Sequence, residues 1–189
     1  MANKESITIY LIRHGEAKAS WDEDKDPGLS QKGKEQSRCL VKEILCELPT
    51  DIKVISSPLL RAKETAFPLQ NKMGFNLEIN TVFSEIPSPG IPLSKRRDWL
   101  RGIFNIKVKD LKKPQQKWRD KINKSIKLIQ KDTLIFSHFM VINSVVGWIN
   151  KSEKFVNFYP DNCSITKIKK HEEKFKITEL GRDLHTIIQ

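Results

Sequence analysis

Cationic and imidazole side chains follow three apolar runs of the sequence. The run IYLI leads directly into Arg13 and His14, VISS leads through PLL into Arg61, and LIFS leads into His138. Each run has the length and the β-branched content of a short buried strand. Because functional groups in α/β sheets gather at the carboxyl ends of strands, we expect these four side chains along one edge of a sheet.

Such a cluster has the chemistry of a phosphate site. The guanidinium groups of Arg13 and Arg61 offer fixed donor forks that suit phosphate oxygens. Their positive charge also disfavours protonation of His14 and His138, since like charges lower the pKa of an imidazole. A neutral imidazole keeps a free lone pair and is a known covalent nucleophile. The residue types therefore predict phosphoryl transfer by a histidine nucleophile without a metal, because the arginines would repel a metal cation.

The two residues after His14 fit the same chemistry. Gly15 is expected to let the backbone approach the ligand closely, and Glu16 is expected to orient a neighbouring basic group. Each short stretch taken alone also fits an ordinary core or surface residue, and the prediction depends on all of them occurring together. The remaining histidines, His171 and His185, do not follow an apolar run of this kind and are predicted to be surface residues.

The elements that must position these residues alternate along the chain. Strands are predicted for SITIYLIR, IKVISS, LEINT and DTLIFS. Helices are predicted for LSQKGKEQSRCLVKEIL with Ser30 as N-cap, for KRRDWLRGIF, for QQKWRDKINKSIKLIQ and for FMVINSVVGWI. A further helix, PLLRAKETAFPLQNK, is expected to have Pro58 in its first turn and to kink or break near Pro68.

Near the C-terminus, SITKIKK and KFKITEL have the alternation of a strand pair and predict a hairpin. The whole pattern predicts an α/β fold, a three-layer sandwich with a mostly parallel central sheet, helices on both faces and an antiparallel C-terminal strand element. We find no internal repeat or flexible linker, so we expect residues 1–189 to form a single domain.

The charge of the chain indicates which kinds of partner to expect. Lys and Arg number 34 against 23 Asp and Glu, which gives a net charge of +11. The lysines are scattered over several segments and do not alternate with aromatic residues, so we expect a solvated surface or attraction of anionic substrates rather than nucleic-acid binding. No apolar stretch is long enough to span a membrane, and the N-terminus lacks the features of a signal peptide. A cytoplasmic location and no membrane partner are therefore expected.

The three cysteines do not indicate a disulfide framework, and none has the spacing of a zinc ligand. Cys39 and Cys46 are seven residues apart in a helical pattern, and we expect them to pack as small hydrophobic residues on one face.

Taken in order, these motifs resemble the histidine phosphatase superfamily, also called phosphoglycerate mutase-like, and within it the small phosphatases. The stretches that carry the resemblance are LIRHGEA, LSQKGKEQS, VISSPLLRAKETA, LIFSHFMVIN and NCSIT. The resemblance implies a phosphomonoesterase without a cofactor, in which His14 becomes a phosphohistidine. Arg13, Arg61 and His138 would bind the phosphoryl group, and His138 would also take part in catalysis.

The superfamily usually has a carboxylate acid/base in an irregular loop after the third strand. Glu85, in VFSEIPSPG, fits this place and would protonate the leaving oxygen and later activate water. Glu78 and Asp98 are weaker candidates.

Some positions depart from the superfamily pattern. Phe139 follows the second histidine where many members have glycine, and it would either shape leaving-group selectivity or point into the core. Ala17 stands where mutases often carry a hydroxyl, and SEIPSPG replaces the Glu-Arg-x-Tyr-Gly run of phosphoglycerate mutases. These departures, together with the short chain, favour a phosphatase over a mutase.

Three alternatives remain open at this stage. A phosphohistidine protein phosphatase or a sugar-phosphate mutase would use the same intermediate, with a phosphoprotein or a small phosphorylated molecule as substrate. A catalytically silent module would only hold phosphate. The segment IPSPGIPLSKRRDWLRGIF is interpreted either as a lid with Arg96, Arg97 and Trp99 at the entrance, or as a surface helix whose Trp99 packs into the core, and we favour the core position for Trp99. The sequence predicts neither the substrate nor the oligomeric state.

Overall fold

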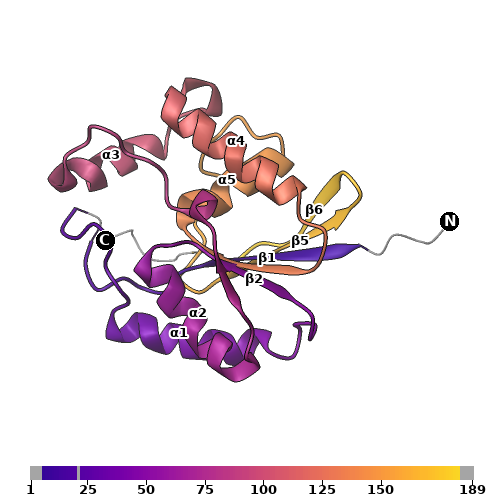
Figure 1. Ribbon diagram of the computed structural model, residues 1–189. Coiled ribbons are helices and arrows are strands. Elements are labelled where there is room, and N and C mark those ends of the chain that lie inside the picture. Colours follow the sequence, from indigo (N-terminus) through magenta and orange to yellow (C-terminus); the bar gives the residue numbers. More distant parts are fainter. Residues whose placement is uncertain (1–5, 21, 184–189) are drawn as a thin grey trace.

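The computed structural model describes residues 6–20 and 22–183, whose strands form a six-stranded sheet in the order β3-β2-β4-β1-β5-β6 (Figure 1). The strands are β1 (Ile7–Arg13), β2 (Lys53–Ser56), β3 (Leu77–Ile79), β4 (Thr133–Ser137), β5 (Ile165–His171) and β6 (Lys174–Glu179). The first four are parallel to one another, whereas β5 runs antiparallel to β1 and β6 antiparallel to β5. The predicted parallel sheet with an antiparallel C-terminal hairpin is confirmed.

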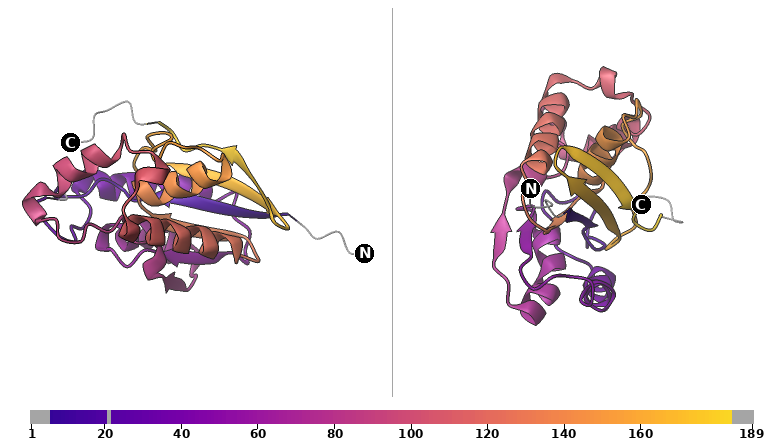
Figure 2. Two further views of the ribbon diagram at one scale, coloured as in Figure 1. Left: turned by 90° about the horizontal axis from the view of Figure 1, so that it is seen from above. Right: turned by 90° about the vertical axis from the view of Figure 1, so that its right-hand side faces the viewer.

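Helices cover both faces of this sheet, as the views in Figures 1 and 2 show. The helices are α1 (Gln31–Ile44), α2 (Leu60–Met73), α3 (Arg96–Ile103), α4 (Lys113–Lys127) and α5 (Phe139–Ile149), with short 3-10 turns at Thr81–Phe83, Leu93–Lys95 and Val108–Asp110. Helices α1 and α2 lie on one face, and α4 and α5 lie on the other. The predicted three-layer α/β sandwich is therefore confirmed.

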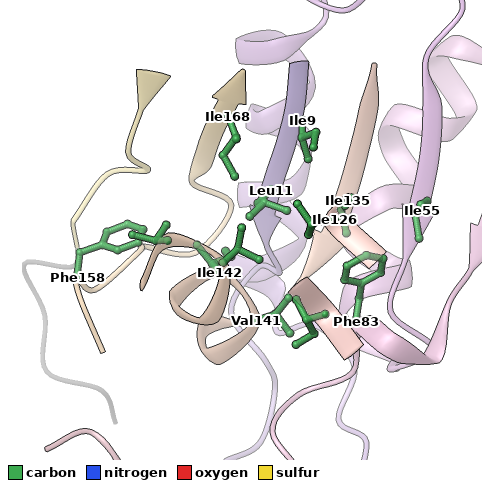
Figure 3. Close-up of a cluster of buried hydrophobic side chains, with 13 residues drawn as sticks. Ile9, Leu11, Ile55, Phe83, Ile126, Ile135, Val141, Ile142, Phe158 and Ile168 are labelled. Carbon is green, nitrogen blue, oxygen red and sulfur yellow. The ribbon is translucent and has the colours of Figure 1, made fainter. Parts of the chain in front are cut away.

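Strand β1 shows how the sequence builds the two core layers. Ile9 and Leu11 belong to the hydrophobic cluster under α4 and α5 (Figure 3), whereas Tyr10 and Ile12 belong to the cluster under α1 and α2. Successive side chains of a strand point to opposite faces, so an unbroken apolar run is what a strand buried on both faces requires. The core on both faces therefore holds β1 in place up to Ile12, the residue before Arg13.

The register of the sheet brings strand ends together. Arg13 pairs with Ser137 at the ends of the neighbouring parallel strands β1 and β4. The residue after β1, His14, donates its backbone N–H to the Ser137 carbonyl at 3.0 Å. Ser56 pairs with Phe136, so β2 ends at the same edge. The expectation that the three apolar runs end side by side is met.

Helix α2 differs in two respects from the sequence prediction. It begins at Leu60, so Pro58 precedes the helix instead of lying in its first turn, and the Ser57 hydroxyl accepts a hydrogen bond from the Leu59 N–H at 3.2 Å. The helix also continues unbroken through Pro68 to Met73. Buried residues on both sides of the proline, Ala66 and Leu69, pack on the sheet and offset the hydrogen bond that proline removes.

The structure of α1 tests two further predictions, the cap at Ser30 and the packing of two cysteines. Ser30 caps α1 by accepting a hydrogen bond from Gly33, as predicted. Cys39 and Cys46 are exposed, so the prediction that they pack as small hydrophobic residues is wrong; the buried face of α1 is made by Leu40 and Ile44 instead.

Among the histidines outside the cluster, His171 is exposed as expected, and His185 lies outside the described residues. Trp99 of α3 packs against the hydrophobic cluster that contains Phe139, in agreement with the favoured interpretation of this side chain. Within the described part of the chain, we find no helix with both the length and the apolar character needed to cross a membrane.

Candidate active site

The four side chains predicted to meet do meet at the carboxyl edge of the sheet. Arg13 ends β1, His14 follows it, Arg61 lies in the first turn of α2, and His138 follows β4. The rings of His14 and His138 have centroids 5.1 Å apart. Arg61 donates from Nε to His14 Nε2 at 3.1 Å. His14, Arg61 and His138 are all buried, so their interactions take place away from bulk water.

The hydrogen bonds of His14 assign its tautomer. Nδ1 lies 2.7 Å from the carbonyl oxygen of Gly15, an acceptor, so Nδ1 carries the proton. Nε2 accepts from Arg61 and therefore holds the lone pair. The backbone carbonyl of His14 accepts from Asn162 Nδ2 at 2.9 Å, which ties the loop before β5 to this residue. The nitrogen that keeps the lone pair is thus the one that faces the guanidinium group.

Gly15 has a packing role that the sequence did not indicate. A Cβ atom at this position would lie 2.7 Å from the backbone oxygen of Gly33 in α1, so a side chain would push the two segments apart. Its N–H donates to Thr65 Oγ1 at 2.9 Å, and that hydroxyl donates in turn to the carbonyl of Arg61 at 2.7 Å. Gly15 therefore sets the distance between the turn after β1 and α1, and Thr65 connects that turn to α2.

Glu16 holds the same turn against the start of α1. Its Oε1 accepts from the Ser30 hydroxyl at 2.7 Å, and its Oε2 lies 3.0 Å from Lys32 Nζ. The hydrogen bond from Ser30, followed by that from Lys32, lowers the pKa of the Glu16 carboxyl. The basic group beside Glu16 is therefore Lys32.

Several buried nitrogen atoms at this edge have no hydrogen-bond partner among the described residues. Arg13 donates from Nη1 to the carbonyl of Pro160 at 2.8 Å, but its Nε has no hydrogen-bond partner among the described residues. Arg61 Nη1 and His138 Nδ1 are likewise buried without a partner in the described part of the chain. Buried polar groups are normally paired, so the unpaired donors of the two guanidinium groups indicate a place for an anion.

Burial and charge keep both imidazoles neutral. The pKa of His14 lies well below 6.5, because burial lowers it most and the charges of Arg61 and Arg13 lower it further. The pKa of His138 is lowered in the same way, first by burial and then by Arg61. Burial also lowers the pKa of Arg13 to about 10, which leaves this side chain charged at neutral pH. The sequence prediction named the arginines as the cause, whereas burial is the larger one.

Glu85 brings a carboxylate into the range of the arginines. It follows the turn after β3, is half-buried, and accepts from the Ile86 N–H at 2.9 Å. Burial raises its pKa, and the backbone hydrogen bond and the charges of Arg61 and Arg13 only partly oppose this rise. A second backbone bond comes from Met140 at the start of α5. Glu85 therefore has the raised pKa of a general acid beside the two guanidinium groups.

The weaker carboxylate candidates have different surroundings. Glu78 in β3 forms an exposed ion pair with Lys53 at 2.8 Å. Asp98 in α3 is 80% exposed at its side chain and lies 3.8 Å from Arg101. Neither contributes to the pKa shifts of Arg13 or His14. Of the three carboxylates, the geometry favours Glu85.

Sequence reasoning assigned no role to three residues that hold the site together. Ser57 Oγ lies 2.7 Å from His138 Nε2, and Thr65 and Asn162 support the turn that carries His14. A signal was present for each. Ser57 follows β2 directly, Thr65 lies one helical turn after Arg61, and Asn162 precedes β5. The described residues contain no group of three or more His, Cys, Asp or Glu side chains that would hold a metal ion.

The part of the chain that carries most of this edge is similar to a known protein family. Residues 9–88 match the profile of the histidine phosphatase superfamily (branch 1). This range contains Arg13, His14, Arg61 and Glu85, whereas His138 lies beyond it. The chain thus resembles this superfamily in the segment that carries most of the candidate site.

Among curated proteins, the chain is similar to the mitochondrial serine/threonine-protein phosphatase Pgam5 of Drosophila persimilis. The aligned 73 residues are 40% identical and cover 38% of this chain but only 25% of the relative. The same values hold for the Pgam5 of Drosophila pseudoobscura pseudoobscura. The chain thus matches about a quarter of the length of these relatives.

Solved structures share the fold over nearly the whole chain. A mycobacterial glucosyl-3-phosphoglycerate phosphatase in complex with VO3 has a TM-score of 0.72 and 15% identity, covering 92% of this chain and 98% of that one. A phosphoserine phosphatase from Entamoeba histolytica has a TM-score of 0.71 and 19% identity, covering 95% of this chain and 98% of that one. A phosphoglycerate mutase from Bacillus anthracis has a TM-score of 0.66 and 15% identity, covering 94% of both chains.

Sequence and fold therefore agree: the chain has the fold of the histidine phosphatases and mutases and resembles their superfamily. The match to the superfamily covers residues 9–88, and the solved structures extend the likeness in fold to nearly the whole chain.

Proposed function

We propose that this chain is a phosphomonoesterase of the histidine phosphatase superfamily, that its nucleophile is His14, and that it acts through a phosphohistidine. The observation that carries the proposal is the hydrogen bond of 3.1 Å from Arg61 Nε to His14 Nε2. It identifies the unprotonated nitrogen and puts a phosphate-binding guanidinium group beside it. A phosphoryl group held by that guanidinium would lie within reach of the lone pair.

In the first step, His14 Nε2 attacks phosphorus, forming an N–P bond while the P–O bond to the leaving group breaks. Arg13, Arg61 and His138 bind the phosphoryl oxygens and stabilise the charge on them in the transition state. Glu85 gives its proton to the leaving oxygen, a role to which its raised pKa is suited. The product is an alcohol, and the enzyme keeps the phosphoryl group on His14.

In the second step, the Glu85 carboxylate takes a proton from water, and the water oxygen attacks phosphorus. The O–P bond forms as the N–P bond breaks, which releases inorganic phosphate and restores neutral His14 and protonated Glu85. No oxidant, reductant or further cofactor is needed for this cycle.

Two observations support hydrolysis over the alternatives. A silent phosphate-binding module has no use for a carboxyl group with a raised pKa beside its arginines, whereas Glu85 has that property. A mutase must hold its substrate for a second transfer, and Ala17 offers no hydroxyl for this purpose. The physiological substrate, whether a small phosphorylated molecule or a phosphoprotein, and the cytoplasmic location stay predictions.

The test is turnover of 4-nitrophenyl phosphate by the purified chain. We expect hydrolysis by the wild-type protein and its loss, by about 10³-fold or more, in the His14→Asn variant. His171→Asn, a substitution of an exposed histidine, is the matched control and should retain activity. The proposal fails if the wild-type protein releases no phosphate, or if the His14→Asn variant hydrolyses the ester as fast as the wild type.

A further inference from the structure

Three aromatic rings form a cluster beside the candidate site, which we call the aromatic wall: Phe104, Phe139 and Tyr159. The rings of Phe104 and Phe139 are stacked with centroids 5.2 Å apart. Tyr159 contacts both, at 6.1 Å from Phe104 and 5.6 Å from Phe139. The residues come from three separate segments, namely the end of α3, the start of α5 and the loop before β5. Their exposure rises outward, from 5% at Phe139 to 42% at Tyr159.

The wall is joined directly to the phosphoryl-binding groups. Phe139 follows His138, and the Arg13 guanidinium lies 5.5 Å from the centroid of the Phe139 ring. The same guanidinium donates to the carbonyl of Pro160, the residue after Tyr159. Arg13 therefore lies against Phe139 with its polar edge held by the segment that carries Tyr159.

The proposed general acid lies beside the same wall. The Glu85 carboxylate accepts from the N–H of Met140, the residue after Phe139. Ile86 belongs with Phe139 and Met140 to one buried hydrophobic cluster, and Phe104 packs against that cluster. A leaving oxygen that receives the proton of Glu85 therefore starts next to the base of the aromatic wall. A group attached to that oxygen and extending toward solvent would pass along the wall, whose exposure increases from Phe139 to Tyr159.

We propose that the aromatic wall selects phosphomonoesters whose leaving group is a planar aromatic ring, with Tyr159 as the main specificity-determining residue. This inference rests on the proposed function and adds its substrate class. A planar ring stacks on aromatic side chains more favourably than a polyol does, because the wall offers few hydrogen bonds and a large apolar surface. Tyr159 is the member with the surface left to make this contact.

The experiment compares phenyl phosphate with 2-naphthyl phosphate. The two leaving groups are similarly acidic and differ by one fused ring, so the ratio of their kcat/KM values reports contact with that ring. The wild-type protein should favour the naphthyl ester. Tyr159→Ser should lower the naphthyl-to-phenyl ratio by roughly two- to tenfold, the range expected for the loss of one aromatic pair.

Three further variants make the result specific. Tyr159→Phe retains the ring and should keep the ratio, while Phe104→Leu, which removes a different ring of the wall, should lower it. Phe67→Ser, at an exposed aromatic residue of α2 that forms no ring contact with another described residue, should leave the ratio at the wild-type value. Thermal unfolding of each variant establishes that it is folded.

The outcomes separate this inference from the proposed function. If neither ester is hydrolysed in a manner that depends on His14, the proposed function fails and the inference fails with it. If both esters are hydrolysed through His14 but Tyr159→Ser and Phe104→Leu keep the wild-type ratio, only the inference is overturned. A free aryl ester and phosphotyrosine in a peptide share this chemistry, and a comparison of kcat/KM for 2-naphthyl phosphate and a phosphotyrosine peptide distinguishes these two sources.

Discussion

The two ends of the parallel strands both have positively charged side chains, but among the described residues these are paired with carboxylates at one end and not at the other. At the amino ends of β2 and β4, a cavity of about 370 Å³ is lined by Lys53, Lys131 and Glu78 among others. Both lysines are paired there, Lys53 with Glu78 at 2.8 Å and Lys131 with Asp51 at 2.7 Å. At the carboxyl ends, Arg13 and Arg61 form no ion pair within 4.0 Å with a described carboxylate.

This difference shows why the presence of a cavity alone does not identify a binding site for an anion in this protein. An exposed lysine paired with a carboxylate has most of its charge already neutralised and is hydrated besides. A buried arginine without an ion-pair partner has already lost its hydration shell, and its free N–H groups can still donate hydrogen bonds to an anion. An anionic substrate is therefore expected at the end with Arg13 and Arg61, and not at the end where both lysines are paired with carboxylates.

Among the changes that probe the difference between the two ends, removing the proton donor at the arginine end should have the largest effect. Glu85→Gln should lower kcat by about 10²- to 10⁴-fold for an alkyl phosphate, because the poor leaving group needs protonation. The loss in the first step should be smaller for 4-nitrophenyl phosphate, whose leaving group is acidic. Steady-state and burst-phase kinetics on the two esters measure both effects.

The pH dependence of the wild-type protein tests whether Glu85 acts as the proton donor. Glu85 must carry its proton in the first step, so kcat/KM for an alkyl ester should fall as the pH rises through the raised pKa of Glu85. This decline should be absent in Glu85→Gln. Equal losses on alkyl and nitrophenyl esters, with the decline retained, would assign the proton transfer to another group.

The comparison between the two ends is sharpened by a matched pair of variants. Arg61→Gln should lower kcat/KM by about 10²- to 10³-fold, since it removes a donor that stabilises the transferring phosphoryl group. Lys53→Gln, at the opposite end, should change it by less than about twofold, because this lysine is exposed and already paired. Hydrolysis of 4-nitrophenyl phosphate measures both. Similar losses in the two variants would mean that the ends do not differ in the way described.

A smaller effect concerns stability. The pKa values of His14 and His138 are lowered in the folded protein, so these imidazoles are neutral while those of the unfolded chain gain protons below pH 6.5. The unfolded state then binds more protons, and the free energy of unfolding should fall as the pH drops below 6.5, by about 1.4 kcal/mol per pH unit for each histidine. Urea unfolding between pH 7 and pH 5 measures this slope.

Glu85 acts on stability in the opposite sense, because its folded-state pKa is raised above 4.5 and its contribution falls as the pH rises through that pKa. The test is therefore the difference between wild type and His138→Asn, which should have the shallower acid slope, with His171→Asn as control. An acid slope in His138→Asn as steep as that of the wild type would show that His138 is not held neutral.

The sequence predicted the fold and the meeting of Arg13, His14, Arg61 and His138 for a physical reason. Each of these residues lies within a few positions of the end of a buried parallel strand, and strands of one parallel sheet end at one edge. At these positions, the place of a residue just after an apolar run is enough to predict where it lies in the folded sheet.

Contacts between segments far apart in the chain were not predictable in this way. The joining of Tyr159 to Phe104 depends on the path of two irregular loops, and the unbroken helix at Pro68 depends on packing against the sheet. Cys39 and Cys46 show the related error on a helix face, because their spacing alone did not reveal that Leu40 and Ile44 make the buried side. Residue propensity and spacing describe a single segment. Ring contacts between loops, the continuity of a helix and the buried face of a helix depend instead on the other segments that it packs against.

The central claim is that His14 Nε2 forms a bond to phosphorus, and the most direct measurement is to trap that bond. The protein is mixed with 4-nitrophenyl phosphate, quenched in alkali, digested and analysed by mass spectrometry. We predict an acid-labile, alkali-stable phosphoryl group on His14, in larger amount in Glu85→Gln because the second step lacks its base. Phosphate found on another residue, or on none while the ester is being hydrolysed, would contradict the account.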